Sequence, residues 1–323
     1  DADRNPNTPD PVVSLNDLLK FIGEYHPVSS QAGREYESHF FSKQAYIPVD
    51  RNKVLASGMV SPADSANIPD RIPVNLNKDV LLKDDIAVLD IIASNMFERP
   101  VYFAVTCRPD KLFGLQDFME LDGLALRVTP VRSQSDPTFG IVGSGRVNTD
   151  FLYKNVMEKY RWGNFDKYDL YVDRSYTPSV QSMQTMILRA SADLIQKGDT
   201  ARGIQLVDKY FESFPHMNFP YDYRTMYMLN VYFQAGAYEK AKPYLQILAT
   251  QLEQYLNFYE SLNPDIITTS FRQDYGLAYQ AMETMIQRVQ SAGDTEFVSE
   301  LRNRFAAYLV DDTLPETAPP SNQ

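Results

Sequence analysis

The sequence of 323 residues predicts an α/β or α+β domain with a small mixed sheet, followed by an all-α array of tetratricopeptide-like helical hairpins. The first observation is the distribution of glycine and proline: residues 1–174 contain 9 Gly and 12 Pro, whereas residues 175–310 contain 5 of each. The second observation is a change in the spacing of apolar residues within the first half. The third is that apolar residues in the second half recur at helical spacing, so that they form stripes along the predicted helices. We therefore expect domains at residues 1–174 and 175–310 and a disordered, proline-rich tail at residues 311–323.

The first half begins with alternating helical and strand-like patterns. Ser14 is a candidate N-cap for a helix at residues 15–22, where apolar residues recur at helical spacing. The aromatic and β-branched run at residues 40–49 suits a strand, and a short helix is expected at residues 51–57. Apolar residues at spacings of three and four over residues 82–96 predict a further helix, which a proline ends.

Beyond residue 100 the hydrophobic period shortens. Apolar runs at residues 101–106 and 124–131 are bounded by Pro, Asp and Gly and are consistent with buried strands. A helical turn is expected between them at residues 113–120. An amphipathic segment at residues 151–160 and an edge strand at residues 169–173 complete the domain. Helices interleaved with a few strands indicate an α/β or α+β class.

The second half consists of paired helical stripes joined by glycine-containing turns. The turns contain Gly198, Gly236 and Gly293, at spacings of 38 and 57 residues. Regular tetratricopeptide repeats recur at about 34 residues, so we predict three stretched repeats, which stack and leave a concave face suited to a peptide or another domain. Most Tyr and Phe residues fall on the stripes and are assigned to the core, including Tyr255 and Tyr259.

Composition and charge exclude several classes of function. The chain has 42 Asp and Glu against 31 Lys and Arg, a net charge of −11, and no basic block, so nucleic acid is excluded as a main partner. With 44% hydrophobic residues it can bury a core without metals or disulfides. The longest apolar runs fall far short of the ~20 residues that cross a bilayer, so no membrane span is expected here.

Motifs that would hold a cofactor or metal are not recognisable. The glycine cluster at residues 140–145 lacks both G-x-G-x-x-G and a Walker lysine and is interpreted as a surface loop, and the histidines are isolated. Asp84 and Asp85 point apart on a helix, which indicates a solvated N-terminal turn. The single cysteine, Cys107, is expected to be a small buried residue. We therefore predict no cofactor, no metal and no catalytic residue in this chain.

The most unusual local composition surrounds the single tryptophan. Trp162 is flanked by Tyr160 and Arg161, and Asp150 opens the preceding helical segment. Aromatic faces suit sugar rings and Arg suits carboxylates, so these four residues are the candidate ligand or interface residues. The alternative, which we favour, is structural: Thr149 caps the helix, and the tryptophan fills the junction between the two halves.

Several segments in order resemble one family, the Bacteroidetes multi-pass membrane proteins catalogued as a domain of unknown function. Four segments carry most of the likeness: FERPVYFAVT at residues 97–106, LQDFMELDGLALRVTP at residues 115–130, RVNTD at residues 146–150 and YRWG at residues 160–163. Smaller patches precede them, and the family's helical C-terminus resembles residues 175–310. In place of the family's Glu-Gly-Leu-Ala-Tyr-Arg, this chain has Asp122 to Arg127 with Leu126 replacing Tyr, which indicates packing at that position.

The resemblance implies a place and a partner. The family's membrane half resembles GT-C glycosyltransferases, in particular protein O-mannosyltransferases with lipid-linked sugar donors. The chain would then be a C-terminal, extracytoplasmic region on the periplasmic side of the inner membrane, tethered through transmembrane helices that precede it. Because the GT-C catalytic acid lies between those helices, no catalytic residue carries over to this sequence.

We therefore expect a non-catalytic accessory region of a GT-C-like glycosyltransferase, whose partners are the membrane half of the same polypeptide and an acceptor polypeptide or envelope protein bound by the array. One alternative is a soluble periplasmic enzyme acting on glycans, with a carboxylate cleft between the domains. Another is a structural envelope adaptor without a glycosylation role.

Overall fold

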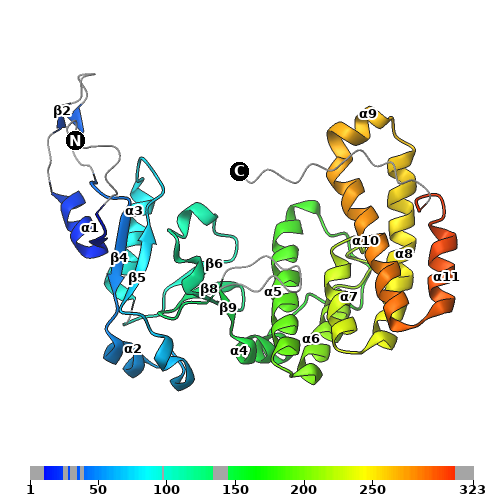
Figure 1. Cartoon of the computed structure of the whole chain (residues 1–323), viewed down its shortest axis with the longest axis horizontal. Coiled ribbons are helices and arrows are strands. Elements are labelled where there is room, and N and C mark those ends of the chain that lie inside the picture. The colour runs from blue at the N-terminus through cyan, green and yellow to red at the C-terminus, as the bar shows by residue number, and fades with distance from the viewer. Residues whose placement is uncertain are drawn as a thin grey trace. The chain divides into compact units, whose positions relative to one another are not determined.

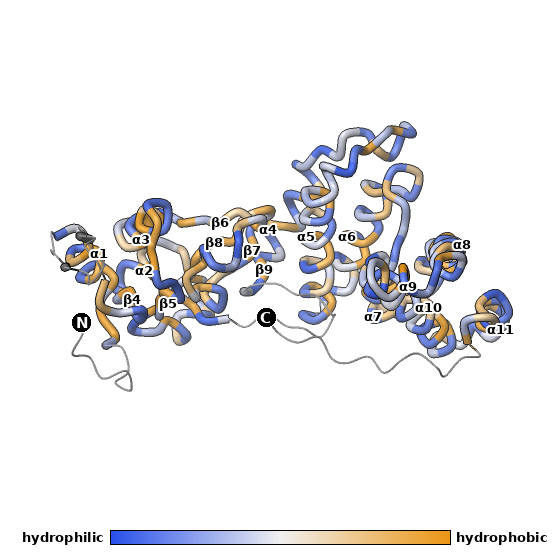
Figure 2. The backbone as a smooth tube through the Cα atoms, turned by 90° about the horizontal axis from the view of Figure 1, so that it is seen from above, coloured by the Kyte–Doolittle hydropathy of each residue, from blue (hydrophilic) through white to orange (hydrophobic). Residues whose placement is uncertain are grey.

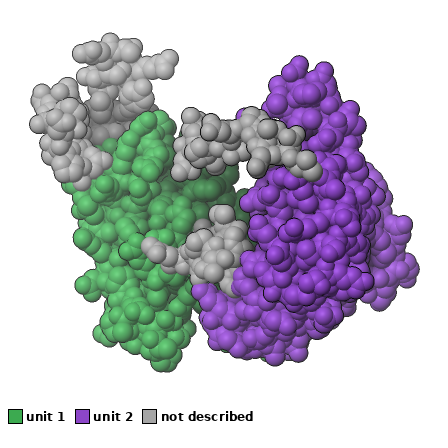
Figure 3. Space-filling view, turned by 45° about the vertical axis from the view of Figure 1, so that its right-hand side comes forward, with its two compact units in different colours: residues 1–155, 178–186 green, residues 156–177, 187–323 purple. Residues whose placement is uncertain are grey.

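The computed structural model describes residues 11–24, 28–29, 35–36, 40–96, 98–133 and 145–309. The predicted tail at residues 311–323 and most of the glycine cluster, residues 140–144, lie outside this set. The chain divides into two compact units, shown in Figure 3: unit 1 contains residues 1–155 and 178–186, and unit 2 contains residues 156–177 and 187–323. Each unit is described by itself.

Unit 1 contains a three-stranded sheet of order β1 (Val13–Ser14), β4 (Gln44–Pro48), β5 (Arg71–Asn75) (Figure 1). β4 runs parallel to β1 and antiparallel to β5, with Ile47 opposite Ile72. Helix α1 (Leu15–Gly23) contacts both β4 and helix α3 (Lys83–Asn95). The predicted helices and the strand are confirmed, as is α2 (Arg51–Ser57).

A short hairpin, β2 (Val28–Ser29) with β3 (Glu35–Tyr36), also belongs to unit 1. Single 3-10 turns connect several elements of the unit: η1 (Pro62–Asn67), η2 (Pro109–Lys111) and η3 (Leu115–Phe118). Cys107, expected to be buried, is only half-buried, because it lies in the tight turn that follows the strand at residues 102–104.

The second sheet of unit 1 has the order β6 (Tyr102–Ala104), β8 (Ala125–Val128), β7 (Met119–Asp122), β9 (Arg146–Val147). β8 is antiparallel to both of its neighbours, whereas β7 and β9 are parallel. The sequence interpretation missed β7, because residues 113–120 were assigned to one helical turn. The turn is confined to η3, and Gly123 at φ +70° then closes a two-residue hairpin between β7 and β8.

Two further expectations about this region are wrong. Helix α4 (Thr149–Lys154) is capped by Asn148, whose side chain accepts from Phe151 N, and not by Thr149; it continues as a π-turn over residues 155–159. Residues 169–173, predicted as an edge strand, form no strand. Their backbone is instead held by a side chain: Leu170 N donates to Asn218 Oδ1 at 2.6 Å. By contrast, Leu126 is buried, as predicted.

The helical array follows the predicted stripes closely. Its helices are α5 (Thr177–Gln196), α6 (Thr200–Ser213), α7 (Thr225–Gln234), α8 (Tyr238–Glu260), α10 (Arg272–Ala292) and α11 (Thr295–Arg304), with the short α9 (Pro264–Ile266) and a π-turn, Ile267–Phe271, before α10. Gly198, Gly236 and Gly293 all have positive φ, which ends each preceding helix. Figure 2 shows both apolar and polar residues along every long helix. Among the described residues, none of the helices is long and apolar enough to span a membrane.

The core of the array is made of the predicted aliphatic residues, and one glycine sets a close approach. Leu248, Leu252 and Met282 are completely buried. A Cβ on Gly203 would lie 2.5 Å from Ile195 Cδ1, so α6 packs against α5 at a distance that only glycine permits. Tyr255 and Tyr259, assigned to the core from the stripe, are only half-buried, because the stripe turns toward solvent near the end of α8.

Candidate functional site

The four residues singled out from sequence lie in two different places. Asp150 is exposed in the first turn of α4, in unit 1. Tyr160, Arg161 and Trp162 belong to the segment 156–177 of unit 2. The structure brings Tyr160 and Trp162 together, and their role as ligand or interface residues stays a prediction.

Trp162 packs into an aromatic group on the first hairpin of the array. Its ring lies edge-on to Tyr160 and Phe214, with centroids 5.9 and 5.4 Å away. Its Nε1 is buried and has no hydrogen-bond partner. Arg161 points back along its own chain, with Nη1 3.1–3.2 Å from the carbonyl oxygens of residues 158–160, so its guanidinium closes the end of the π-turn.

The rest of this segment is held by one buried amide. Asn218, between α6 and α7, donates from Nδ2 to the carbonyls of Phe165 and Tyr168, both at 2.7 Å, and accepts from Leu170 N. Phe165 also packs edge-on against Phe219, at 4.9 Å between centroids. A side chain thus supplies the hydrogen bonds that a neighbouring strand would otherwise give.

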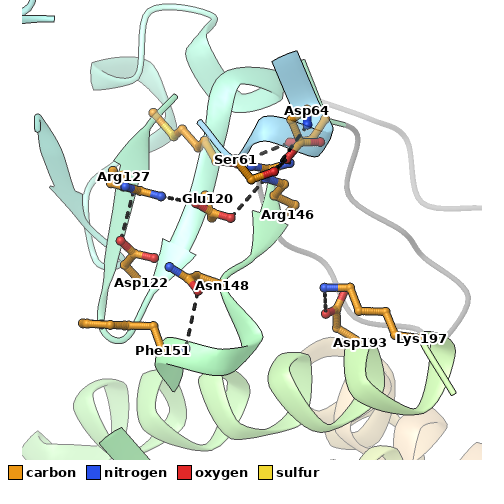
Figure 4. Close-up of polar contacts among 12 residues, drawn as sticks. Ser61, Asp64, Glu120, Asp122, Arg127, Arg146, Asn148, Phe151, Asp193 and Lys197 are labelled. Carbon is orange, nitrogen blue, oxygen red and sulfur yellow. Dashed lines mark hydrogen bonds and ion pairs between the residues drawn. The ribbon is translucent and has the colours of Figure 1, made fainter. Parts of the chain in front are cut away.

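One group of paired charges in unit 1 lies on the four-stranded sheet and is shown in Figure 4. It consists of Asp64, Glu120, Asp122, Arg127 and Arg146, which we call the charge network. Glu120 is its centre: Oε2 accepts from Arg127 Nη2, and Oε1 accepts from Arg146 Nε at 3.0 Å. Arg146 Nη1 also donates to Asp64 Oδ2, at 2.8 Å. The network therefore joins β7, β8, β9 and the turn η1.

The acids of the network differ in environment. The Asp122 side chain is only 6% exposed, and burial raises the pKa of its carboxyl above the usual value, against the opposing effect of Arg127. Arg127 Nε lies 3.1 Å from Asp122 Oδ2 without hydrogen-bond alignment, and Asp122 Oδ1 has no partner. Asp64, on the other hand, has its pKa lowered by the hydrogen bond from Arg146.

A second cluster in unit 1 fixes the start of α3. The Asp85 side chain is 1% exposed and accepts from Lys78 Nζ and Lys111 Nζ, both at 2.6 Å, and from Leu82 N at 2.9 Å. Burial alone would raise the pKa of Asp85, but these hydrogen bonds lower it to about 2. The expectation of a solvated turn is therefore wrong for Asp85 and holds for Asp84, which is exposed.

The hydrogen bonds of the charge network fit a structural role in the sheet better than a catalytic role. Both guanidinium groups are engaged with carboxylates, so they are not available as an anion site, and Glu120 is held by two arginines. Burial raises the pKa of Asp122, and Arg127, Asn148 and Tyr102 lie close enough to lower it, so this acid also faces partners within the unit. Within the described part of the chain, no group of three or more His, Cys, Asp or Glu side chains is placed to hold a metal ion.

Sequence reasoning missed this network, although one signal was present. The Asp122-Gly123 pair predicts a two-residue hairpin, which sets Glu120 opposite Arg127 across β7 and β8. Asp64 and Arg146, 82 residues apart, carry no such local signal. The network does, however, gather residues from two of the segments that carry the family resemblance, 115–130 and 146–150.

A comparison with known protein families finds a match in this region of the chain. Residues 3–151, slightly less than half of the chain, match the family model described as TMEM260-associated domain 2. The matched span contains the whole charge network, and α5 to α11 lie outside it. No curated protein matches the chain, and no solved structure does.

Proposed function

We propose that this chain is a non-catalytic interaction region of a TMEM260-like, membrane-embedded glycosyltransferase of the GT-C type, and that its helical array binds an acceptor polypeptide or partner protein. The observation that carries the proposal is the match of residues 3–151 to TMEM260-associated domain 2. In this proposal the glycosyl transfer, of the protein O-mannosylation kind, takes place in the membrane half of the same polypeptide. The chain itself lies on the periplasmic side of the inner membrane.

The chemistry of unit 1 supports an accessory role. In the charge network, and around Asp85, the acids are paired with the basic side chains of the same unit. Such pairing holds loops in one conformation, which a docking domain needs. A catalytic acid for sugar transfer would instead need a free face toward its substrate.

The architecture of unit 2 supports the recruiting role. Stacked helical hairpins bury their aliphatic stripes and present the remaining faces as an extended surface for polypeptides. Large apolar side chains remain exposed on this unit, including Met217, Phe258 and Ile266. Of these, Phe258 adjoins another apolar ring, that of Phe271, at 6.2 Å between centroids, and contiguous exposed apolar side chains mark interaction surfaces.

The proposal is tested in cells with the full-length protein. A strain that lacks the gene is complemented with either the wild-type protein or a variant without residues 187–309, and glycosylated proteins are compared by lectin blot and mass spectrometry. We expect glycosylation of some or all acceptors to fall at least tenfold with the deletion. Unchanged glycosylation of every acceptor would contradict the recruiting role.

The control is the abundance of each variant in the membrane fraction. If the deletion lowers that abundance, Phe258→Lys replaces it, since this half-exposed side chain can be changed without removing a buried residue. The matched control is Leu55→Lys, an exposed apolar residue of α2 in unit 1, which should leave acceptor glycosylation unchanged.

A further inference from the structure

Tyrosines recur at helical spacing on three neighbouring helices of the array. One pair, four residues apart, lies at the end of α8, and another lies near the start of α10. A third pair has one member in the turn before α7 and one in the first turn of α7. We call these six residues the tyrosine band: Tyr223, Tyr227, Tyr255, Tyr259, Tyr275 and Tyr279. Each is half-buried, so one part of the ring packs on the array and the rest faces solvent. Residues four apart share one face of a helix, so the pairs on α8 and α10 each form a short aromatic stripe. Tyr223 lies in the turn that precedes α7, and Tyr227 lies in the first turn of that helix.

The three pairs adjoin one another. Helix α8 contacts both α7 and α10, and Figure 1 shows the three side by side. Between α8 and α10, the Tyr259 ring lies 6.0 Å from that of Tyr275 and 5.7 Å from that of Phe271. Tyr223, just before α7, is close enough to α10 for the charge of Asp274 to raise the pKa of its hydroxyl. The exposed ring of Phe258 extends the surface at the end of α8.

Carboxylates surround the band. Asp222 is paired with Arg224 through Nε, at 2.9 Å, and Nη2, and the same guanidinium lies 5.6 Å from the centre of the Tyr223 ring. Glu260 accepts from the Tyr275 hydroxyl at 3.1 Å. Asp274 is exposed and has no cationic partner among the described residues. Two carboxylates, Glu260 and Asp274, are thus left without a positive charge to balance them.

Of the charged groups just described, three are carboxylates and one is a guanidinium, so we expect a negative electrostatic potential at the band. Burial is the main cause that raises the pKa of Tyr223, Tyr259 and Tyr275. Asp274 raises the pKa of Tyr259 further, and Glu260 that of Tyr275, whereas at Tyr223 the positive charge of Arg224 opposes the carboxylates. An aromatic face already carries a negative quadrupole that attracts cations. Rings and carboxylates at this surface therefore favour the same kind of ligand group, a positively charged one.

We propose that the tyrosine band binds an extended polypeptide segment that carries lysine or arginine side chains. The inference deepens the proposed function and depends on it for the polypeptide nature of the ligand. The cationic side chains lie over the rings and pair with Asp274 and Glu260. Tyrosine hydroxyls can bind the backbone groups of the segment, since a hydroxyl both donates and accepts hydrogen bonds. The Tyr275 hydroxyl, which donates to Glu260, is left as an acceptor.

The experiment measures binding to the intact chain by fluorescence anisotropy. The probe is a fluorescein-labelled peptide of twelve residues in which four lysines alternate with Ser and Gly, and the matched peptides carry Gln or Glu in place of Lys. We expect the lysine peptide to bind at least about tenfold more tightly than either, and its affinity to fall as sodium chloride rises from 20 to 300 mM. Equal binding of the three peptides overturns the proposal.

Two variants locate the binding. Glu260→Gln with Asp274→Asn removes both unbalanced charges and should weaken the lysine peptide about three- to tenfold, in keeping with exposed ion pairs. Tyr259→Leu keeps the buried part of the side chain and should weaken it about two- to fivefold. The control pair, Glu296→Gln with Glu300→Gln, changes two exposed acids of α11 outside the band and should have no effect.

The remaining outcomes also decide the question. If the control pair weakens binding as much as the band variants, the interaction is general attraction to an acidic protein and the proposal is wrong. If mannan or another neutral glycan binds and is lost with Tyr259→Leu, while the lysine peptide does not bind, the band is a sugar platform. The binding measurements do not depend on glycosylation, so the two hypotheses can fail separately. If the lysine peptide binds but deletion of the array leaves glycosylation in cells unchanged, only the proposed function is contradicted. If the deletion lowers glycosylation but the peptide does not bind, only this inference is contradicted.

Discussion

The two units of this chain stabilise themselves in different ways. Unit 1 has short strands and 3-10 turns, and it buries acids: Asp85 and Glu120 are both almost inaccessible to solvent. In the described part of unit 2, the buried side chains are aliphatic, aromatic or small neutral polar ones, and its acids lie at helix caps and on the surface. The buried amide of Asn218, which is neutral, makes three hydrogen bonds to the backbone of residues 165–170 in this unit.

The difference follows from the lengths of the elements. A helix of ten or more residues satisfies its own backbone and needs only an apolar stripe to pack, whereas strands of two to five residues leave turns that must be held by side chains. Charged groups that pair at such turns are costly to bury and costlier to leave unpaired. Unit 1 should therefore respond strongly to charge-removing substitutions and to acid, and unit 2 to changes of shape and of its buried amide.

The largest effect is expected from Asp85→Asn. Its removal leaves Lys78 and Lys111 without their shared buried acceptor, so unit 1 should lose about 3 kcal/mol of unfolding free energy, as for a broken buried ion pair. Native-state hydrogen exchange of amides in β4 and β5 measures it. Asp84→Asn is the matched control: this exposed carboxylate also pairs with Lys111, at 2.5 Å, and its loss should change the exchange far less, as for an exposed ion pair.

The stability of the wild-type protein and of Asp85→Asn should also depend differently on pH. The folded pKa of Asp85, about 2, is lower than its unfolded value near 3.8, so its stabilisation is present above pH 3.8 and is lost as the pH falls toward 2. The difference between wild type and Asp85→Asn should therefore shrink over this range. A difference that stays constant from pH 5 to pH 2 would show that the charge of Asp85 is not what matters.

In unit 2, Asn218→Ala should cost about 2–3 kcal/mol, because three backbone groups of residues 165–170 lose their partner. Urea unfolding followed by the emission of Trp162 measures it, since this single tryptophan packs in the same segment. Asn303→Ala, an exposed position on α11, is the control and should be neutral or slightly stabilising. Equal effects of the two substitutions would contradict the clamping role of Asn218.

Within the charge network, Glu120→Gln should destabilise unit 1 by about 2 kcal/mol, and Asp122→Asn by less than about 1 kcal/mol. Glu120 accepts from two arginines, whereas Asp122 is already disfavoured as an anion by burial. Because burial raises its pKa, Asp122 contributes with the opposite sign to Asp85: its unfavourable effect at neutral pH is relieved as the pH falls through the folded value. Hydrogen exchange at β7 and β8 distinguishes the two variants, and the reverse order would refute this account.

The smallest effects on unfolding free energy are expected from two helical glycines, and these effects should have opposite signs. Gly203→Ala should destabilise unit 2 by about 1 kcal/mol, because the new Cβ meets Ile195. Gly276→Ala on α10 should stabilise it by about 0.5–1 kcal/mol, because no atom lies within 4 Å of the new Cβ and the unfolded chain loses freedom. Thermal unfolding by circular dichroism measures both, and shifts in the same direction would contradict the close packing of α5 on α6.

Much of unit 2 could be predicted because its information is local. The stripes and the glycine turns gave the helices of the array to within a few residues, since a helix and its cap depend on neighbours in sequence. The errors arose where a distant partner decides. Residues 169–173 look like a strand, but their hydrogen bonds go to Asn218, and Tyr255 and Tyr259 continue a core stripe beyond the part of α8 that is covered.

The sequence by itself determined the fold class, the order of most helices and strands, and the acidic, aromatic character of the chain, because these follow from composition and hydrophobic period. Only the tertiary structure decided which charges are buried together, as with Asp64 and Arg146, and which aromatic residues stay at the surface, as in the tyrosine band. Both depend on contacts between segments far apart in sequence, and periodicity within a single segment carries no information about such contacts.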